Sequence, residues 1–194
     1  MKRGSVMGHK EFMAEAVRLA TESVEEGWGG PFGAVITKDG EIIARGQNRV
    51  LLTADPTAHG EVEAIRKAIQ VFNPEAPSIS EAYLDRYTLK LVPRPEGSPD
   101  VVPERARMLQ GCTIYTSGAP CPMCMSAIYW ARIGAVYYSC DWKATQEIGF
   151  DDAFQYEDFA KPPDRRSITL EQIHPELGTT SYRAWADRAN KHPY

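Results

Sequence analysis

Two short motifs in this sequence combine side chains that bind metals and move protons. His59 and Glu61 stand two positions apart near the predicted start of one helix, and Cys121 and Cys124 stand three apart at the predicted start of another. Residues three apart on a helix share one face, so both sulfurs can point at one atom. The free N–H groups and the dipole of a helix N-terminus favour the thiolate, which is the form that binds a metal. The pattern therefore predicts a metal site made of two thiolates and one imidazole.

Three protein ligands are typical of a catalytic zinc site. Zinc prefers four ligands, so His59, Cys121 and Cys124 leave one position for a water molecule whose pKa the metal lowers. Glu61 is the expected proton carrier between this water and a substrate. Residues two apart in the middle of a helix point in different directions, so His59 and Glu61 can serve one site only from the first turn. We expect one Zn²⁺ per subunit.

Other interpretations of these residues stay open at this point. A C-x-x-C pair alone also occurs in thioredoxin-like redox proteins, and a structural zinc site needs a fourth Cys or His. Cys112 and Cys140 stand singly in predicted strands, where a small buried side chain is the simpler interpretation. A zinc-stabilised binding module without catalysis is a further alternative, and the presence of Glu61 argues against it.

Hydropathy periods predict the elements that carry the motifs. Apolar residues at helical spacing predict helices over residues 9–26, 57–72, 121–132, 143–148 and 182–190. Segments rich in β-branched and aromatic residues predict strands over residues 32–37, 41–50, 112–116, 135–140 and 167–173. Residues 38–40 predict a hairpin turn, whereas 51–56 and the stretch from 150 to 163 predict irregular structure. We expect an α/β fold, a three-layer α-β-α sandwich with a central mixed five-stranded sheet.

Length and composition favour a single domain over residues 1–194. Of the 194 residues, 43% are hydrophobic and 25% charged, which excludes a globally disordered chain. A proline-rich stretch at about 73–110 is longer than ordinary connections, and we interpret it as an insertion. The net charge of −4 disfavours nucleic acid as a partner, because such proteins usually carry a basic face. We find no membrane-spanning apolar run and no secretory signal, and we expect a cytoplasmic protein.

The motifs H-x-E and P-C-x-x-C resemble the signature of the zinc-dependent cytidine/deoxycytidylate deaminase superfamily. Within it the chain is most similar to the small bacterial guanine deaminases. The similar segments are residues 29–35, 46–48, 55–59, 64–68, 120–124, 127–132, 149–152 and 190–194. The resemblance covers nearly the whole chain except about 73–110, and it implies a cytidine deaminase-like fold.

This resemblance implies hydrolytic deamination of a free purine base, with guanine becoming xanthine and ammonia. Carried over by position, His59, Cys121 and Cys124 hold zinc, Glu61 shuttles protons, and Asp152 assists proton transfer at the amino group. The residues implied to contact the base are Phe32, Asn48, Gly60, Trp130 and Tyr194, with the last as a C-terminal lid. A homodimer is also implied, in which a C-terminal segment at about 150–194 is exchanged between subunits.

Two departures from the family pattern leave the substrate open. Gly60 stands where the family usually has alanine, and Gly118 and Ala119 stand where the guanine deaminases usually have cysteine and glutamate. The alternatives are another aminoheterocycle or nucleoside, such as cytosine, an aminopurine, a pterin or a triazine. A tRNA adenosine deaminase is a further alternative that the negative net charge disfavours.

Overall fold

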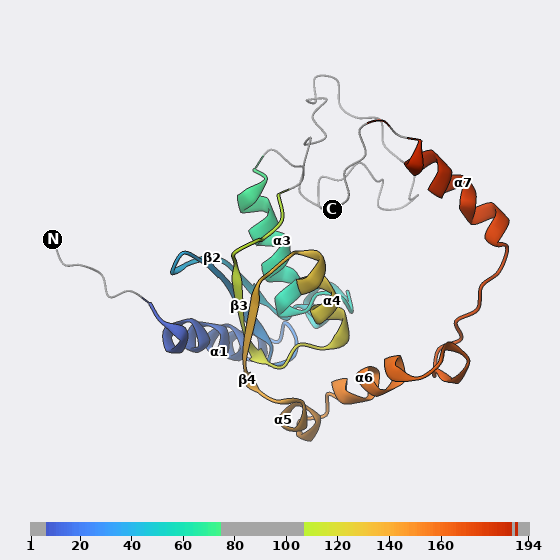
Figure 1. The fold of residues 1–194 in the computed structure, drawn as a ribbon. Helices are drawn as coiled ribbons and strands as arrows, with labels where there is room; N and C mark the ends of the chain where they lie inside the picture. The colour runs from blue at the N-terminus through green and yellow to red at the C-terminus, as the bar shows by residue number, and fades with distance from the viewer. Residues whose placement is uncertain (1–6, 75–106, 188, 190–194) are drawn as a thin grey trace.

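A computed structural model of the chain describes residues 7–74, 107–187 and 189 (Figure 1). Its elements follow the order helix, hairpin, helix, strand, helix, strand, and then a run of C-terminal helices. The elements are α1 (His9–Glu25), β1 (Gly33–Lys38), β2 (Glu41–Gln47), α2 (Val50–Thr53), α3 (Gly60–Phe72), β3 (Thr113–Gly118), α4 (Pro122–Trp130), β4 (Ala135–Cys140), α5 (Trp142–Glu147), α6 (Asp152–Ala160), η2 (Pro163–Arg165) and α7 (Pro175–Ala186).

The strands form one mixed sheet in the order β2-β1-β3-β4. Strand β1 is antiparallel to β2 and β3, and β3 is parallel to β4, with α4 as the crossover between them. The β1–β2 turn falls at Asp39 and Gly40, which both have positive φ (50° and 81°), as the favoured two-residue hairpin turns require. The mixed α/β architecture agrees with the prediction from sequence.

The prediction of a fifth strand is wrong for the described chain. Residues 167–171 alternate polar and apolar side chains, but the whole predicted strand, 167–173, lies outside the sheet. A strand forms only where a neighbour takes its N–H and C=O groups, and in the described residues β4 remains the edge of the sheet. The sheet therefore has four strands.

Each face of the sheet packs against helices. Ala34 and Ile36 of β1 face α3 and α4 in the larger core cluster, while Val35 between them faces α1 with Phe12. Side chains alternate faces along a strand, so one short strand supplies both cores. This packing holds the N-terminal ends of α3 and α4 near one another, and both metal motifs lie there.

Helix α3 lies unusually close to β2. A Cβ atom added at Gly46 would overlap the carbonyl oxygen of Gly60 and the backbone of Ala64. Only the absence of a side chain at Gly46 permits this approach. The contact fixes the first turn of α3 against the sheet.

The ends of the proline-rich stretch lie together. The side chain of Asn73 accepts a hydrogen bond from the backbone N–H of Arg107 (2.8 Å) and donates one to its carbonyl (2.9 Å). These bonds hold the two flanks of the stretch side by side. Most of the predicted insertion at 73–110, including its possible short strand, lies outside the described residues.

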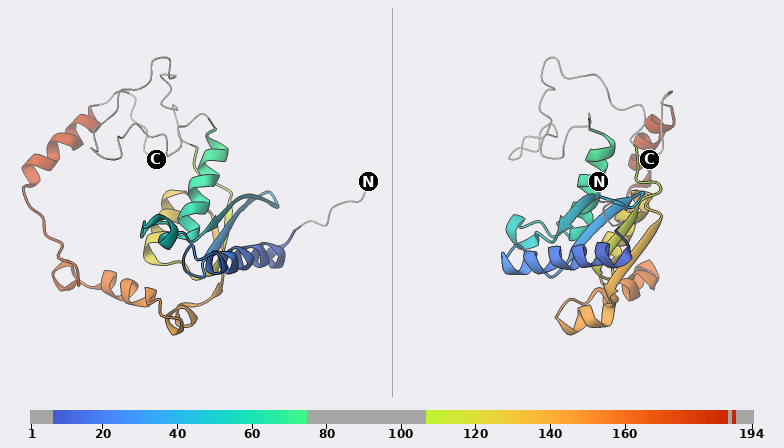
Figure 2. Two further views of the ribbon diagram at one scale, coloured as in Figure 1. Left: turned by 180° about the vertical axis from the view of Figure 1, so that it is seen from behind. Right: turned by 90° about the vertical axis from the view of Figure 1, so that its left-hand side faces the viewer.

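Helices occupy parts of two segments for which irregular structure was predicted. Helix α2 occupies part of the predicted loop, and α6 occupies part of the segment predicted to be irregular, where Asp151 caps the helix by accepting a hydrogen bond from Phe154 N–H (3.1 Å). Figures 1 and 2 show α6, η2 and α7 forming an arm that leads away from the sheet. None of the described helices is long and apolar enough to cross a membrane.

Candidate active site

His59 and Glu61 lie at the very start of α3. His59 is the residue before the first turn, with extended backbone (φ −75°, ψ 153°), and Glu61 is the second residue of the helix. The turn before them is fixed by Asp55, whose carboxylate accepts hydrogen bonds from the N–H and the hydroxyl of Thr57 (2.8 and 2.7 Å). Residues two apart in the middle of a helix point in different directions. Because His59 precedes the helix, its side chain and that of Glu61 can face the same site.

Cys121 and Cys124 occupy the first turn of α4. Cys121 precedes the helix, Pro122 is its first residue, and Cys124 follows on the same face. The His59 Nδ1 atom lies 3.7 Å from the Cys121 Sγ and 3.5 Å from the Cys124 Sγ. All three ligand atoms lie within 4.8 Å of one another.

This donor set fits a zinc ion. Bond lengths of about 2.1 Å to nitrogen and 2.3 Å to sulfur at tetrahedral angles place the ligand atoms roughly 3.6 Å apart, close to both observed separations. Sulfur is a soft ligand and imidazole nitrogen a borderline one. Such ligands suit zinc, whereas calcium and magnesium prefer oxygen ligands. A set of three leaves the fourth tetrahedral position open.

The two sulfurs differ in their ease of ionisation. Hydrogen bonds from Cys124 and His59 lower the pKa of Cys121 to about 4 against the opposing effect of burial, so this sulfur is a thiolate at neutral pH. The Cys121 side chain and burial raise the pKa of Cys124, because two adjacent thiolates repel one another. A divalent cation between them would relieve this repulsion.

Two carboxyl groups face the same region. Glu61 is 6% exposed, and burial raises its pKa. Burial, followed by the nearby Cys121 charge, raises the pKa of Asp152 as well. A carboxyl whose pKa is raised returns a proton more readily than an ordinary carboxyl does after accepting it at neutral pH, which is the property of a general acid–base group.

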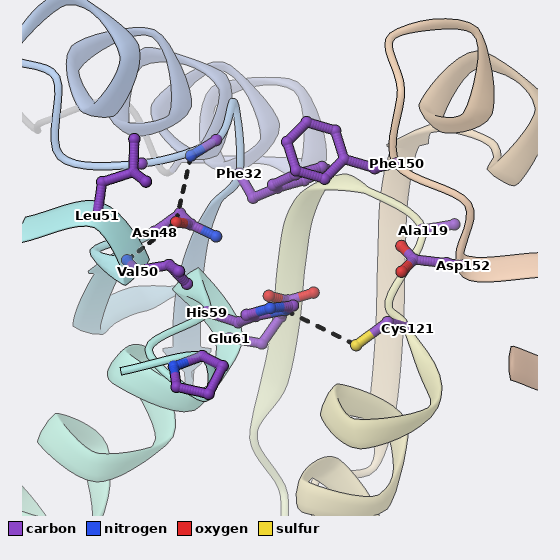
Figure 3. A pocket seen from close by; sticks show the side chains of 13 residues that line it. Phe32, Asn48, Val50, Leu51, His59, Glu61, Ala119, Cys121, Phe150 and Asp152 are labelled. Carbon is purple, nitrogen blue, oxygen red and sulfur yellow. Dashed lines mark hydrogen bonds between the residues drawn. The ribbon is translucent and has the colours of Figure 1, made fainter. Parts of the chain in front are cut away.

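These groups open into one cavity of about 410 Å³ (Figure 3). His59, Glu61 and Cys121 lie at one end, Asp152 lies beside Cys121, and apolar side chains form much of the remaining wall. Such a combination of an apolar cavity with a few convergent polar groups is typical of a small-molecule site.

Asn48 presents a fixed donor to this cavity. It is 3% exposed, and its Oδ1 accepts hydrogen bonds from the N–H groups of Gly30 and Val50, both 3.2 Å long. With the oxygen held this way, the amide Nδ2 is the atom that turns toward the cavity (Figure 3). The site can therefore offer an N–H to an acceptor atom of a ligand.

Two aromatic rings line the side of the cavity that faces His59 and Glu61 (Figure 3). Phe32 and Phe150 meet edge to face, with ring centres 5.0 Å apart and planes at 88°. Phe32 was among the predicted contacts, whereas Phe150 and the apolar residues Val50, Leu51 and Pro56 were not. The sequence carried a signal for Phe150 and Pro56, which lie in the family-like segments 149–152 and 55–59, and none for Val50 and Leu51.

The structure places two other predicted contacts, Gly60 and Trp130, away from the cavity lining. Gly60 packs against the backbone of Phe32 and Gly33 and is not among the cavity-lining residues. Trp130 ends α4 with 61% of its surface exposed and does not line the cavity of its own chain. Tyr194 lies outside the described residues, so the lid stays a prediction.

Sequence comparison identifies the relatives of this site. Residues 7–140, which include His59, Glu61 and both motif cysteines, match the model of the cytidine and deoxycytidylate deaminase zinc-binding region. The chain belongs to this family. The family is named for a zinc-binding region, which agrees with the donor set of His59, Cys121 and Cys124.

The similarity to individual relatives extends beyond the zinc motif. This family member is 42% identical to the guanine deaminase of Bacillus subtilis over 188 residues, which cover 97% of this chain and all of the relative. The crystal structure of that guanine deaminase superposes with a TM-score of 0.77 over 97% of this chain and 99% of the other. The tRNA-specific adenosine deaminase of Aquifex aeolicus is 32% identical over 133 residues, covering 69% of this chain and 66% of the relative.

Proposed function

We propose that this protein is a zinc-dependent aminohydrolase that converts free guanine to xanthine and ammonia. The observation that carries the proposal is the 42% identity to a guanine deaminase along 97% of the chain. The match to the tRNA-specific enzyme covers a smaller share, at lower identity. The net charge of −4 also argues against a polyanionic substrate.

The cavity suits a flat, neutral heterocycle. Phe32 and Phe150 offer aromatic surface, and the Asn48 Nδ2 offers a donor to an acceptor atom at the edge of the ring. A bare base satisfies these contacts without a sugar or phosphate group. We infer that a base held by these contacts turns its amino-bearing carbon toward His59, Cys121 and Glu61, which lie at the other end of the cavity.

The side chains of this chain then manage the protons. When bound by His59, Cys121 and Cys124, zinc would lower the pKa of a coordinated water and so supply a nucleophile near neutral pH. Glu61 accepts a proton from this water and passes it to a ring nitrogen as the new C–O bond forms. Asp152 assists protonation of the amino group, which leaves as ammonia when the C–N bond breaks. Water and guanine give xanthine and ammonia, with no other reactant.

A panel assay tests the proposal. Ammonia release and product identity are measured with guanine, adenine, cytosine, 2-aminopurine, a pterin, a triazine, guanosine and cytidine, with zinc content determined on the same protein. We expect kcat/KM for guanine to exceed that for every other compound by at least about tenfold. Preference for another compound, or for adenosine in a tRNA anticodon stem, would replace guanine as the substrate.

We also infer a homodimer in which the part of the C-terminal segment that follows α6 is exchanged between subunits. Phe150 and Tyr156 contact Phe32 and Pro120 of their own chain, so they are not part of this exchange. Within the described part of the chain, α7 has no buried side chain, and Figures 1 and 2 show it apart from the sheet. The arm exposes large apolar side chains that a soluble monomer rarely leaves in water; they are Phe159, Ile168, Leu170, Ile173, Leu177 and Trp185.

The sheet offers a place for this arm. Strand β4 is the edge of the described sheet, and Tyr137 and Tyr138 on it are both nearly half exposed. Residues 168–173 of a second copy, paired beside β4, would supply the fifth strand that the sequence pattern predicts. Light scattering tests the inference: the intact chain should have the mass of a dimer, and a chain ending at residue 165 should not. A monomeric intact chain would contradict it.

A further inference from the structure

The carbonyl group of Pro120 receives two hydrogen bonds from outside its own element. The Tyr156 hydroxyl donates one (2.9 Å), and the Trp142 Nε1–H donates the other (3.4 Å). Pro120 is buried, and its carbonyl belongs to the peptide bond that leads into Cys121. The bonds therefore join the turn that carries a predicted metal ligand to helices α5 and α6.

Helix α6 depends on such an anchor. Among its described residues only Asp158 is buried, and Phe154 and Phe159 are exposed, so apolar packing contributes little to its position. Tyr156 stands four residues after Asp152, which places both side chains on the same face of the helix. The ring of Tyr156 also meets that of Trp142 edge to face, with centres 5.5 Å apart.

The Tyr156 hydroxyl keeps its proton, and so remains a hydrogen-bond donor, at neutral pH. Burial, together with the charges of Cys121 and Asp152, raises the pKa of Tyr156 to about 12. Its proton is thus present whenever the Pro120 carbonyl requires one. The Trp142 Nε1–H does not titrate, so the second bond is equally independent of pH.

We propose that Tyr156 is a positioning residue that sets the place of Asp152 relative to the Cys121 turn, with Trp142 as the weaker second donor. This inference rests on the proposed function, because it gives Asp152 a part in releasing ammonia. Tyr156 itself does not line the cavity. Its effect reaches the reaction through the placement of the Asp152 carboxyl.

Substitution of the hydroxyl alone tests the proposal. Tyr156→Phe keeps the ring against Trp142 and removes the bond to Pro120. We expect kcat for guanine to fall about tenfold, since a small displacement of a reacting group has effects of this order, while KM changes less than about twofold. Zinc content should match the wild type, and the melting temperature should fall by no more than a few degrees, as expected for the loss of about one hydrogen bond. Tyr138→Phe, which removes a hydroxyl from another ring against Trp142, is the matched control and should leave kcat unchanged.

A double-mutant comparison shows whether the effect passes through Asp152. In an Asp152→Asn background, Tyr156→Phe should add less than about a twofold further loss, because the group it positions no longer transfers protons. A full tenfold loss in that background, loss of zinc from Tyr156→Phe, or wild-type kcat in that variant would each overturn the proposal. A wild-type protein that releases ammonia from other bases but not from guanine refutes the proposed substrate, and the same comparison then applies with the preferred base.

Discussion

Replacing Asn48 by aspartate separates the recognition of the base from the stability of the site. The Oδ1 atom accepts two backbone N–H groups, from Gly30 and Val50, whereas Nδ2 faces the cavity. Asn48→Asp has nearly the same shape and keeps an acceptor for both N–H groups. It exchanges the donor in the cavity for an acceptor, so the two roles of the side chain respond differently.

The expected magnitude follows from these contacts. A donor lost from a buried site, with a charged oxygen left facing an acceptor of the base, costs about 3 kcal/mol, or roughly 100-fold in kcat/KM. The carboxylate keeps both N–H partners, which offset its burial, so the free energy of unfolding should change by less than about 1 kcal/mol. Asn48→Ala leaves both N–H groups unpaired and should lower stability by about 1–3 kcal/mol in addition to weakening turnover.

Steady-state kinetics with guanine and urea unfolding of both variants make the test. We expect a large kinetic loss with normal stability for the aspartate variant, and losses in both activity and stability for the alanine variant. If Asn48→Asp retained kcat/KM within about threefold of wild type, the amide would not be the donor that recognises the base.

Other perturbations give separate expectations. Gly46→Ala places a methyl group against the Gly60 carbonyl and should lower the free energy of unfolding by about 1–3 kcal/mol in urea titrations; wild-type stability would disprove the close approach. Hydrogen bonds from Arg18 and then Arg45 lower the pKa of Glu15, which is 18% exposed, to about 2. Its stabilising effect is therefore complete above the unfolded pKa of about 4.5 and is lost as the pH falls toward 2. Glu15→Gln should lower stability by about 1–2 kcal/mol at pH 7, with a difference from wild type that shrinks below pH 4.5, and a pH-independent difference would refute this assignment. Removal of zinc by a chelator should abolish turnover, and added Zn²⁺ should restore it, whereas full activity in the metal-depleted protein would argue against a catalytic ion.

The chemistry of the site was accessible from sequence because its ligands lie in local motifs. Cys121 and Cys124 share the first turn of a helix whose start Pro122 marks, and His59 precedes another helix start. What remained was to bring two helix N-termini together, and the order of predicted helices and strands already indicated a sheet with helices on both faces.

The walls of the cavity were harder to predict because they depend on distant backbone contacts. Leu51 is placed by a hydrogen bond from its N–H to the carbonyl of Trp28 (3.0 Å), which no local pattern reveals. Phe150 meets Phe32 across more than one hundred residues of chain. The predicted strand at 167–173 failed for a related reason, since its pattern specifies a strand but not the neighbour with which it pairs.

We propose that Glu61 moves the proton at a zinc site that deaminates guanine. Xanthine formation and bound zinc, measured together on Glu61→Gln and wild type, test this role. The substitution keeps the size of the side chain and lies outside the ligand set of His59, Cys121 and Cys124. We predict one zinc per chain in both proteins and a loss of turnover of at least about 10²- to 10⁴-fold in the variant. A zinc-loaded Glu61→Gln protein that forms xanthine at a rate near that of wild type would show that Glu61 does not move the proton.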